Sequence, residues 1–495
     1  MRRILLFTLS LFCGLLAAFA AAQPGNGDAS AWARSIVTIE VARKQFDYYQ
    51  PWGRRTVRAQ KTGLVLNDRE ILTSADQLFD RTLVRLQKNG RGRWFVGDVT
   101  WVDYQANLAI VTTKETDFWN ELKPVKLGTQ IDPNTPLQIV RWREGNLETR
   151  RAEFSQFAVR EGQLSGLSHV TMEVASDIQS AGWAEPIIND SQVVGIITSQ
   201  DGRECNATPM AFIEPILKAR AAGSYKGLGY YHFFWQPSQN PALQARLELP
   251  GAARGVVVIH VPNRPDAGDS VLRKEDIILN IDGFDIDVEG DYQDPMFGYL
   301  MLENLSSRGK WAGDVSTIKI WRDGKEMEVK YTIPKFDYDN ALVPGATYDK
   351  EPEYLIVGGL VFQPLTDSYL QAWGAEWKRR SPFRLFYYRE QEKTPEQPSL
   401  VILSQVLPDP YNTGYTDNRW IVLSRINGQR IATLPDIQEA LKKPSGQFHV
   451  IEFANGETLQ RLVLAAGSEE QAATQRVLER YGIEKGFYFA PGKGK

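Results

Sequence analysis

The sequence predicts a mostly β fold, in which one large strand-rich domain is followed by two smaller α+β units. Three observations support this prediction. Short β-prone runs alternate with Gly, Asn and Asp turns between residues 35 and 197, an amphipathic helix is missing from that pattern, and two later segments share one order of motifs. Strands at this density are typical of a β-barrel or a β-sandwich.

The first domain is predicted to span residues 30–222. Its clearest strand patterns are Ile36–Val41, Gly63–Leu66 and Val193–Ile197, which are apolar and bounded by turn residues. The segment Pro209–Arg220 (PMAFIEPILKAR) has a helical pattern and is expected to close the domain.

Two repeated units follow, at residues 223–335 and 354–466, each about the size of an independent domain of ~100 residues. Each unit opens with a Gly-containing apolar segment, continues with a β-rich phrase and then reaches an Ile-x-Gly turn. The turns are Ile281-Asp282-Gly283 and Ile426-Asn427-Gly428. Residues 336–353, with Pro, Gly and Asp, are the expected linker, and residues 467–495 are expected to be a helical tail with its helix at Glu469–Tyr481.

The first 22 residues have the layout of a secretory signal peptide. Arg2 and Arg3 precede an apolar run at Ile4–Leu16, and small residues at Ala20–Ala22 offer a cleavage site. The apolar run is shorter than the ~20 residues that a membrane span needs. We therefore expect an exported protein, periplasmic or secreted, with no membrane span after cleavage.

The composition argues against several classes of function. The net charge of −3 falls further when Arg2 and Arg3 leave with the signal peptide, and no basic block suggests nucleic acid as a partner. Cys205 would be the single remaining cysteine, so no internal disulfide is expected. The four histidines are far apart in sequence, without metal-ligand spacing. We expect no metal and no other cofactor.

Three segments of the first domain carry a family resemblance. The segment Thr62–Leu78 (TGLVLNDREILTSADQL) resembles the part of HtrA/Deg serine proteases that holds the catalytic histidine. Asn107–Val111 (NLAIV) resembles the strand that begins with the catalytic aspartate, and Ala181–Ile196 (AGWAEPIINDSQVVGI) resembles the segment around the nucleophilic serine. The resemblance implies a chymotrypsin-like double β-barrel followed by two PDZ domains.

The residues at the three catalytic positions of that family are different here. Asp76 stands at the histidine position, Asn107 at the aspartate position and Trp183 at the serine position. Cleavage by this route needs a hydroxyl or thiol nucleophile and a base that takes up its proton near neutral pH. None of the three residues supplies either function, so the resemblance predicts a protease fold without its catalytic triad.

Neighbouring residues do not offer an obvious replacement. Ala184 and Glu185 replace the two glycines beside the nucleophile, and Glu185 would bring a negative charge toward the oxyanion site. Ser180 would act as a nucleophile only if the loop shifted in register. His169 is interpreted as a strand residue in SHVTMEV, with a catalytic role as the alternative. Trp183 would either fill the old active-site cleft or stack on a ligand.

The PDZ-like units predict peptide binding. A PDZ domain adds an extended peptide to a strand edge and holds its C-terminal carboxylate on backbone N–H groups. In the first unit the expected binding residues are Gly227, Leu228, Gly229 and Tyr230, with a simple strand entry at Gly229 as the alternative. In the second unit the weaker candidates are Gly359, Leu360, Val361 and Phe362.

Two classes of function remain open at this point. One is an exported binding protein, a pseudoprotease that holds peptides or unfolded chains as a scaffold or chaperone in envelope quality control. The alternative is an active serine endopeptidase of the HtrA/Deg family with an unrecognised or shared catalytic site. The resemblance also implies a homo-oligomer, with a trimer as the expected form. The aromatic insertion Arg43–Gln60 would either pack between protomers or form a hairpin with a partly buried tip.

Overall fold

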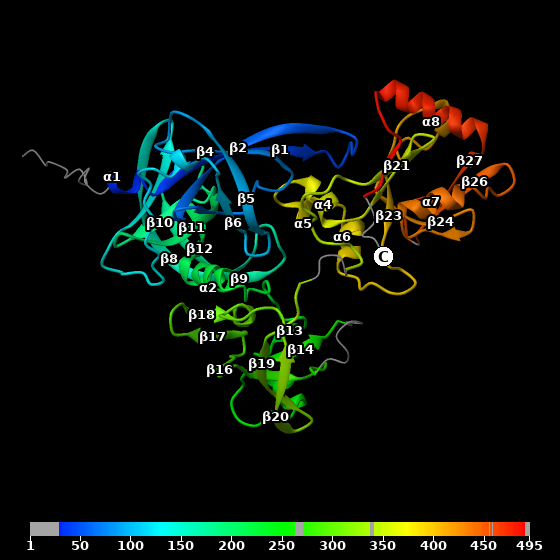
Figure 1. Cartoon of the computed structure of the whole chain (residues 1–495). Coiled ribbons are helices and arrows are strands. Elements are labelled where there is room, and N and C mark those ends of the chain that lie inside the picture. The colour runs from blue at the N-terminus through cyan, green and yellow to red at the C-terminus, as the bar shows by residue number, and fades with distance from the viewer. Residues whose placement is uncertain (1–28, 263–270, 337–340, 455, 458, 491–495) are drawn as a thin grey trace, which may run out of the picture.

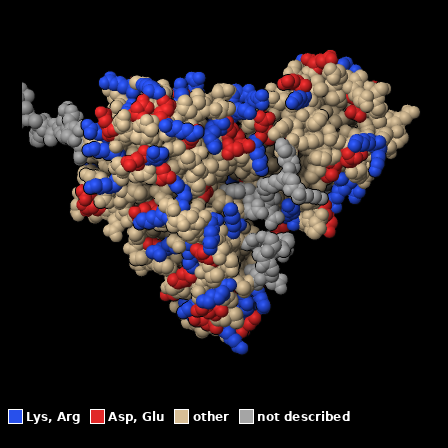
Figure 2. All heavy atoms as spheres, in the orientation of Figure 1, with Lys and Arg blue, Asp and Glu red and all other residues tan. Residues whose placement is uncertain are grey.

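The computed structural model describes residues 29–262, 271–336, 341–454, 456–457 and 459–490. The predicted signal peptide, residues 1–22, lies outside the described residues. Figure 1 shows a strand-rich N-terminal part, a first smaller sheet domain adjoining it and a second one that contains the C-terminal helix α8. Lys and Arg are interspersed with Asp and Glu over the face drawn in Figure 2. The mostly β fold and its order of parts agree with the sequence prediction.

The first barrel is a closed sheet with the order β1-β2-β3-β6-β5-β4. Its core is apolar and includes the buried side chains of Val37, Ile39 and Ile71. A short helix α1 (Ala29–Trp32) precedes it, and a 3-10 turn η1 (Thr116–Phe118) follows it. The strands are β1 (Ile36–Phe46), β2 (Arg54–Asn67), β3 (Glu70–Thr73), β4 (Arg81–Gln87), β5 (Phe95–Asp103) and β6 (Leu108–Thr112).

The second barrel is closed in the order β10-β11-β12-β9-β8-β7. Helix α2 (Met210–Ala221) follows β12 and buries Met210, Phe212 and Ile213, which confirms the helix predicted at Pro209–Arg220. The strands are β7 (Leu137–Arg143), β8 (Asn146–Glu161), β9 (Ser168–Ser176), β10 (Pro186–Asn189), β11 (Gln192–Asp201) and β12 (Glu204–Pro209).

The first smaller domain is built on a sheet with the order β13-β14-β15-β19-β20, in which β16 also pairs with β15. A two-stranded ribbon, β17-β18, accompanies it. The elements are β13 (Phe234–Pro237), α3 (Pro241–Arg246), β14 (Val256–His260), β15 (Ile277–Ile281), β16 (Phe284–Asp285), β17 (Asp291–Asp294), β18 (Gly298–Met301), the 3-10 helix η2 (Leu302–Ser306), β19 (Val315–Arg322) and β20 (Lys325–Thr332).

The C-terminal domain has a sheet with the order β27-β26-β24-β23-β22-β21-β28, and β25 pairs with β24. Its strands are β21 (Tyr354–Val357), β22 (Leu360–Pro364), β23 (Val401–Val406), β24 (Ile421–Ile426), β25 (Gln429–Arg430), β26 (Phe448–Phe453), β27 (Arg461–Ala465) and β28 (Phe487–Tyr488). Its helices are α4 (Asp367–Leu370), η4 (Gln371–Trp373), α5 (Trp377–Arg380), α6 (Phe383–Arg389), η5 (Pro410–Asn412), α7 (Leu434–Leu441) and α8 (Ser468–Tyr481).

The C-terminal segment differs from the separate helical tail expected at residues 467–495. The helix itself is present as α8, close to its predicted bounds. However, its residue Val477 is buried in one cluster with Tyr354 of β21, and β28 pairs with β21. The described part of the tail therefore completes the C-terminal sheet domain, because its apolar residues find their partners there.

The repeated Ile-x-Gly turns form matching hairpins in the two smaller domains. Asp282 and Gly283 connect β15 to β16, and Asn427 and Gly428 connect β24 to β25. All four residues have positive φ, from 52° to 92°. Two consecutive residues with positive φ define the type I′ turn that joins two-residue hairpins, and Asn, Asp and Gly tolerate this backbone best. The internal repeat seen in the sequence thus corresponds to a repeated structural feature.

The aromatic insertion at residues 43–60 forms the distal part of the β1–β2 hairpin, one of the two alternatives that the sequence left open. Its tip contacts the C-terminal domain of the same chain. Tyr48 and Tyr49 pack edge-on against Tyr369 and Trp373, respectively, and the backbone oxygen of Tyr49 accepts a hydrogen bond from Gln405. The hairpin thereby fixes the barrel to the C-terminal domain.

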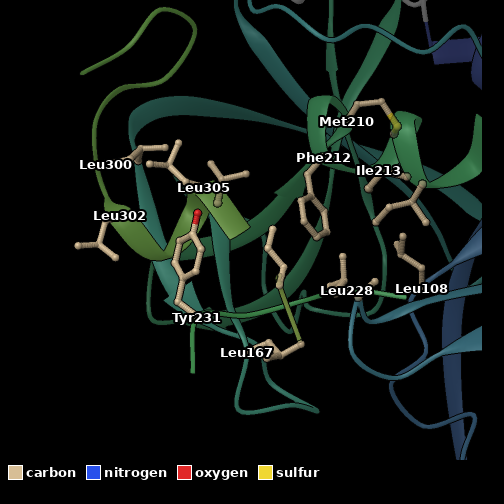
Figure 3. Packing of buried hydrophobic residues seen from close by; sticks show 14 of the residues in the cluster. Leu108, Leu167, Met210, Phe212, Ile213, Leu228, Tyr231, Leu300, Leu302 and Leu305 are labelled. Carbon is tan, nitrogen blue, oxygen red and sulfur yellow. The ribbon is translucent and has the colours of Figure 1, made fainter. Parts of the chain in front are cut away.

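One apolar core joins the barrels to the first smaller domain. The same cluster contains Leu108 from β6, Phe212 from α2, Leu228 and Leu305 from η2. Figure 3 shows Phe212 pointing away from helix α2, with Leu305 on one side of it and Leu228 and Leu108 on the other. Because this core crosses the domain boundary, the segment that enters the first smaller domain is held against the barrels.

Candidate functional site

The three positions predicted to replace a catalytic triad lie close together. Asp76 follows β3, and its backbone N–H donates to Oδ1 of Asn107, just before β6, at 2.9 Å. Trp183 precedes β10, and its backbone oxygen accepts from the N–H of Thr62 at 2.8 Å. Lys61, next to Thr62, donates to the backbone oxygen of Asp76. The fold thus brings together three loops that are far apart in sequence.

The loop that carries Trp183 has its backbone donors occupied. The N–H groups of Gly182 and Trp183 both donate to Oε2 of Glu185, at 3.0 and 2.8 Å. The N–H of Ala181 donates to Oε1 of Gln200 at 2.7 Å. Glu185 is 2% exposed. An oxyanion that forms during acyl transfer needs free, preorganised N–H donors, and here a carboxylate of the chain itself already accepts from two of them.

The backbone of this loop keeps a conformation that favours glycine. Ala184 has φ of 69°, and Ser180 has φ of 55°. A left-handed angle costs a residue with a Cβ about 1–2 kcal/mol. The hydrogen bonds of Glu185 with Gly182 and Trp183 hold the turn and offset part of that strain.

Arg141, from β7, neutralises the buried Glu185. Its guanidinium lies 3.4 Å from Oε1 of Glu185 and donates to Oε2 of Glu148 at 2.9 Å. It also donates to the backbone oxygens of Gln179 and Ser180. Burial raises the pKa of Glu185, whereas the backbone N–H groups and Arg141 oppose the shift. The sequence analysis missed this partnership, because Arg141 lies on β7 and Glu185 lies far away in sequence, in the loop before β10.

A buried lysine supports the other side of the site. Lys61 Nζ donates to the backbone oxygen of Ser74 at 2.8 Å, to Ser74 Oγ at 2.6 Å and to the backbone oxygen of Asp76. Burial lowers the pKa of Lys61 to about 8. Ser74 is fully buried, so a substrate carbonyl does not reach its hydroxyl. Lys61 and Ser74 therefore stabilise the loop after β3. The sequence analysis did not predict this role for either residue.

His169 lies in β9, as its strand interpretation predicted. It is buried, stacks on Phe212 with ring centroids 4.6 Å apart, and has Nδ1 3.1 Å from the backbone oxygen of Val170. Burial lowers its pKa. Ser180 is exposed, and its backbone oxygen is bound by Arg141. Trp183 is partly buried.

The segment predicted to bind peptides in the first smaller domain is largely packed into the protein. Leu228 is 1% exposed and belongs to the core shared with the barrels. Gly229 forms an isolated bridge with Lys335, and a Cβ there would lie 2.2 Å from Ile333. The N–H of Tyr230 donates to the oxygen of Pro334 at 3.3 Å. Glycine is thus needed at Gly229 for close approach of two chain segments.

Strand β13, which follows this segment, lies at the edge of its sheet. It pairs with β14 on one side, and no other described strand pairs with it. Phe234 is 53% exposed on it. The N–H of Ser238 donates to the oxygen of Val288, so the open edge ends after Pro237. Unpaired strand edges are the surfaces to which extended peptides add.

The matching segment of the C-terminal domain has a different environment. Leu360, Val361 and Phe362 lie in β22 and are buried. Strand β22 pairs with β23 on one side and with β21 on the other. Gly359 forms part of the tight turn between β21 and β22, with φ of 89°. A peptide could add to β22 only if β21 first left it.

The described residues offer neither a membrane-spanning helix nor a metal-binding group. No described helix is long and apolar enough to cross a membrane. In the same part of the chain, no three His, Cys, Asp or Glu side chains are grouped in a way that could hold a metal ion.

Comparison with known proteins agrees with this architecture. A PDZ domain family model matches residues 343–487. The chain is 24% identical to the putative protease Do-like 3, mitochondrial, of Arabidopsis thaliana, over 83% of this chain and 72% of that protein. It is 23% identical to the protease Do-like 2, chloroplastic, of the same plant, over 93% and 76%.

Among solved structures, the HtrA-type protease AlgW with a tripeptide matches 63% of this chain and 97% of its own, at 15% identity and a TM-score of 0.49. The relatives from Arabidopsis align with most of this chain, and the PDZ match follows two closed barrels. The chain is therefore similar to HtrA/Deg protease-like proteins along most of its length and contains a PDZ domain.

Proposed function

We propose that this protein is a pseudoprotease, which binds peptides or unfolded chains as extended strands without cleaving them. The observation that carries the proposal is the carboxylate of Glu185, which accepts hydrogen bonds from the backbone N–H groups of Gly182 and Trp183. A substrate oxyanion would have to displace this carboxylate and would meet its negative charge.

The side chains around that loop support the same conclusion. Trp183 has no nucleophilic group, and Asn107 cannot stabilise an imidazolium. Asp76 carries a carboxylate in place of the imidazole that a serine-type mechanism uses as its base. Lys61 uses its ammonium group on three oxygen acceptors. The histidine that accepts the proton in a serine-type mechanism is therefore lacking among these residues.

The binding part of the proposal rests on strand β13. Its edge has no strand partner among the described residues, and its Phe234 side chain is exposed. An added strand would gain main-chain hydrogen bonds there, which are largely independent of sequence. The packed Leu228 shifts the expected binding surface from the Gly227–Tyr230 segment toward β13.

The cellular setting belongs to the proposal as well. The signal-peptide pattern of residues 1–22 supports export to the periplasm or the exterior. Together with peptide binding, this supports a role in protein quality control of the cell envelope, as a scaffold or chaperone. The family resemblance supports a homo-oligomer, with a trimer as the expected form.

A combined activity test addresses the catalytic half of the proposal. The purified chain without residues 1–22 is incubated with unfolded casein and, separately, with a fluorophosphonate probe that labels activated serines. We expect intact casein and no labelling. Labelling that disappears in the Ser180→Ala variant would contradict the proposal and would identify a nucleophile three residues before Trp183.

A further inference from the structure

The described part of the linker between the two smaller domains, residues 341–353, lies against the barrels. Tyr348 packs on Tyr104, in the turn between β5 and β6, with ring centroids 4.4 Å apart, and on Phe79 at 5.2 Å. Its hydroxyl donates to the backbone oxygen of Leu164, between β8 and β9, at 2.6 Å. Residues 341–353 are therefore called the strap.

The strap is also fixed to the C-terminal domain, at the start of helix α4. The backbone N–H of Thr347 donates to Oγ of Ser368 at 2.9 Å. The backbone oxygen of Pro344 accepts from the N–H of Asp367 at 2.8 Å. One short segment thus binds both parts of the molecule, beside the β1–β2 hairpin that reaches the same domain (Figure 1).

Two aspartates meet where the strap crosses the loop after β3. The backbone N–H of Asp80 donates to Oδ1 of Asp349 at 2.8 Å, and the backbone of Asp349 hydrogen-bonds the carboxylate of Asp80 in return. Tyr104 donates its hydroxyl to Oδ2 of Asp349 at 2.7 Å, and Arg81 lies 3.7 Å from Oδ1. The two carboxyl groups are close enough to repel each other when both are ionised.

Asp80 is half-buried between the hairpin and the strap. The charged and titratable groups that face it are Arg43, Lys44, Tyr48 and Asp349. Burial raises the pKa of Asp80 to about 6, and Asp349 adds to the shift, whereas Arg43 and Lys44 oppose it. Lys44 also donates to Glu351 of the strap at 3.1 Å, so its charge is shared between two carboxylates.

We propose that the strap is a pH-sensitive latch, which holds the barrels against the C-terminal domain while Asp80 is protonated and loosens when Asp80 ionises. A carboxyl group whose pKa is higher in the docked state than the ordinary ~3.9 of an exposed aspartate takes up a proton on docking. Docking therefore strengthens as the pH falls. Between about pH 7.5 and about pH 5 the docking equilibrium should change about tenfold.

Hydrogen exchange, measured by mass spectrometry on the chain without residues 1–22, tests the latch. The amide protection of segments 79–83 and 346–352 is compared at about pH 5 and about pH 7.5, after correction for the intrinsic pH dependence of exchange. We expect both segments to be about tenfold more protected at the lower pH. Strand β9 serves as the internal reference, because a change in overall stability would alter its protection as well.

Four variants locate the response. Asp80→Asn carries no charge at either pH and should abolish the difference in protection, while Asp349→Asn removes the neighbouring charge and should reduce it. Asp68→Asn changes an exposed acid in the turn between β2 and β3 and should leave the difference unchanged. His260→Gln should leave it unchanged too, although His260 lies 2.6 Å from Glu392 across two domains and gains charge on acidification. Melting temperatures establish that each variant folds.

The latch is overturned if the corrected protection of the two segments is the same at both pH values, or changes only as much as that of β9. It is also overturned if the difference persists in Asp80→Asn, or if His260→Gln abolishes it. A difference that is lost in Asp80→Asn and kept in Asp68→Asn and His260→Gln supports the latch.

Discussion

The loop before β10 and the edge of β13 are two places where a peptide backbone could be received, and they differ in what already occupies them. In the loop, the N–H groups of Ala181, Gly182 and Trp183 bind side chains of the same barrel. Along β13, one edge has no described strand partner. The contrast teaches that a protease-like fold can engage the N–H groups of this loop in internal hydrogen bonds while a neighbouring sheet keeps an edge without a described strand partner.

In the C-terminal domain, as in the loop before β10, the backbone groups that could receive a peptide already have partners within the chain. The first smaller domain differs in this respect. Both smaller domains share the Ile-x-Gly hairpin, yet β21 pairs with one side of β22, whereas no described strand pairs with the outer edge of β13. A family motif therefore does not establish that a binding edge is available. The pairing of the adjacent strands decides it.

The largest effect is expected when the carboxylate that occupies the N–H groups of the loop before β10 is removed. Glu185→Ala removes the acceptor for two N–H groups and leaves Arg141 buried beside the cavity. Breaking one side of a buried ion pair costs about 3–5 kcal/mol, so the free energy of unfolding, measured by urea denaturation, should fall by that amount. The exposed Glu328→Ala serves as the control and should change it by less than ~0.5 kcal/mol. A similarly small loss in Glu185→Ala would show that the loop is not held by Glu185.

A proline in the covered strand should have the next largest effect. Val361→Pro removes a backbone N–H from the middle of β22, which is paired on both sides. A lost ladder bond and the rigid ring should together cost about 3 kcal/mol. Val361→Ala, measured alongside, gives the cost of the side chain alone. If the two variants unfold at the same urea concentration, β22 is not the interior strand that the comparison requires.

A smaller effect, on the affinity for a peptide, is expected when the charge of the peptide's C-terminal carboxylate is removed. Amidating the C-terminus of a peptide that binds the first smaller domain removes a negative charge, and affinity should fall by about tenfold, or ~1.4 kcal/mol. Isothermal titration of the free-acid and amidated forms measures the difference. Methylating alternate backbone nitrogens of the same peptide gives the comparison, because strand pairing needs those donors. Equal affinities for all forms would exclude strand addition.

The smallest effect, no gain at all, is expected when the nucleophile is restored alone. Trp183→Ser supplies a hydroxyl without a base, and Glu185 still occupies the N–H groups of the loop. Casein cleavage by the variant should therefore stay at the level of the parent chain. Measurable turnover would reveal a proton acceptor among the neighbouring residues, with Lys61 as the first to examine by a Lys61→Met change.

The sequence predicted features that depend on local patterns. The helix α2, the two Ile-x-Gly hairpins and the positions of Asp76, Asn107 and Trp183 follow from short motifs and their order. The partnership of Arg141 with Glu185 could not be predicted, because tertiary packing brings together two residues that lie far apart in sequence. The covering of β22 by β21 is a local hairpin across Gly358 and Gly359, which the sequence analysis missed. Leu228 is a further example. An apolar residue at this position is compatible with a peptide-binding pocket and with a domain core, and only the packing seen in the structure distinguishes the two.

The central claim, binding without cleavage, is tested most directly by one experiment that measures both. A labelled peptide with an apolar C-terminal residue and a free carboxylate is mixed with the chain lacking residues 1–22. Fluorescence polarisation reports the complex, and mass spectrometry of the same sample reports the length of the peptide over several hours. We predict a saturable rise in polarisation with a peptide of unchanged mass. Cleaved peptide, or a polarisation that never rises, would contradict the claim.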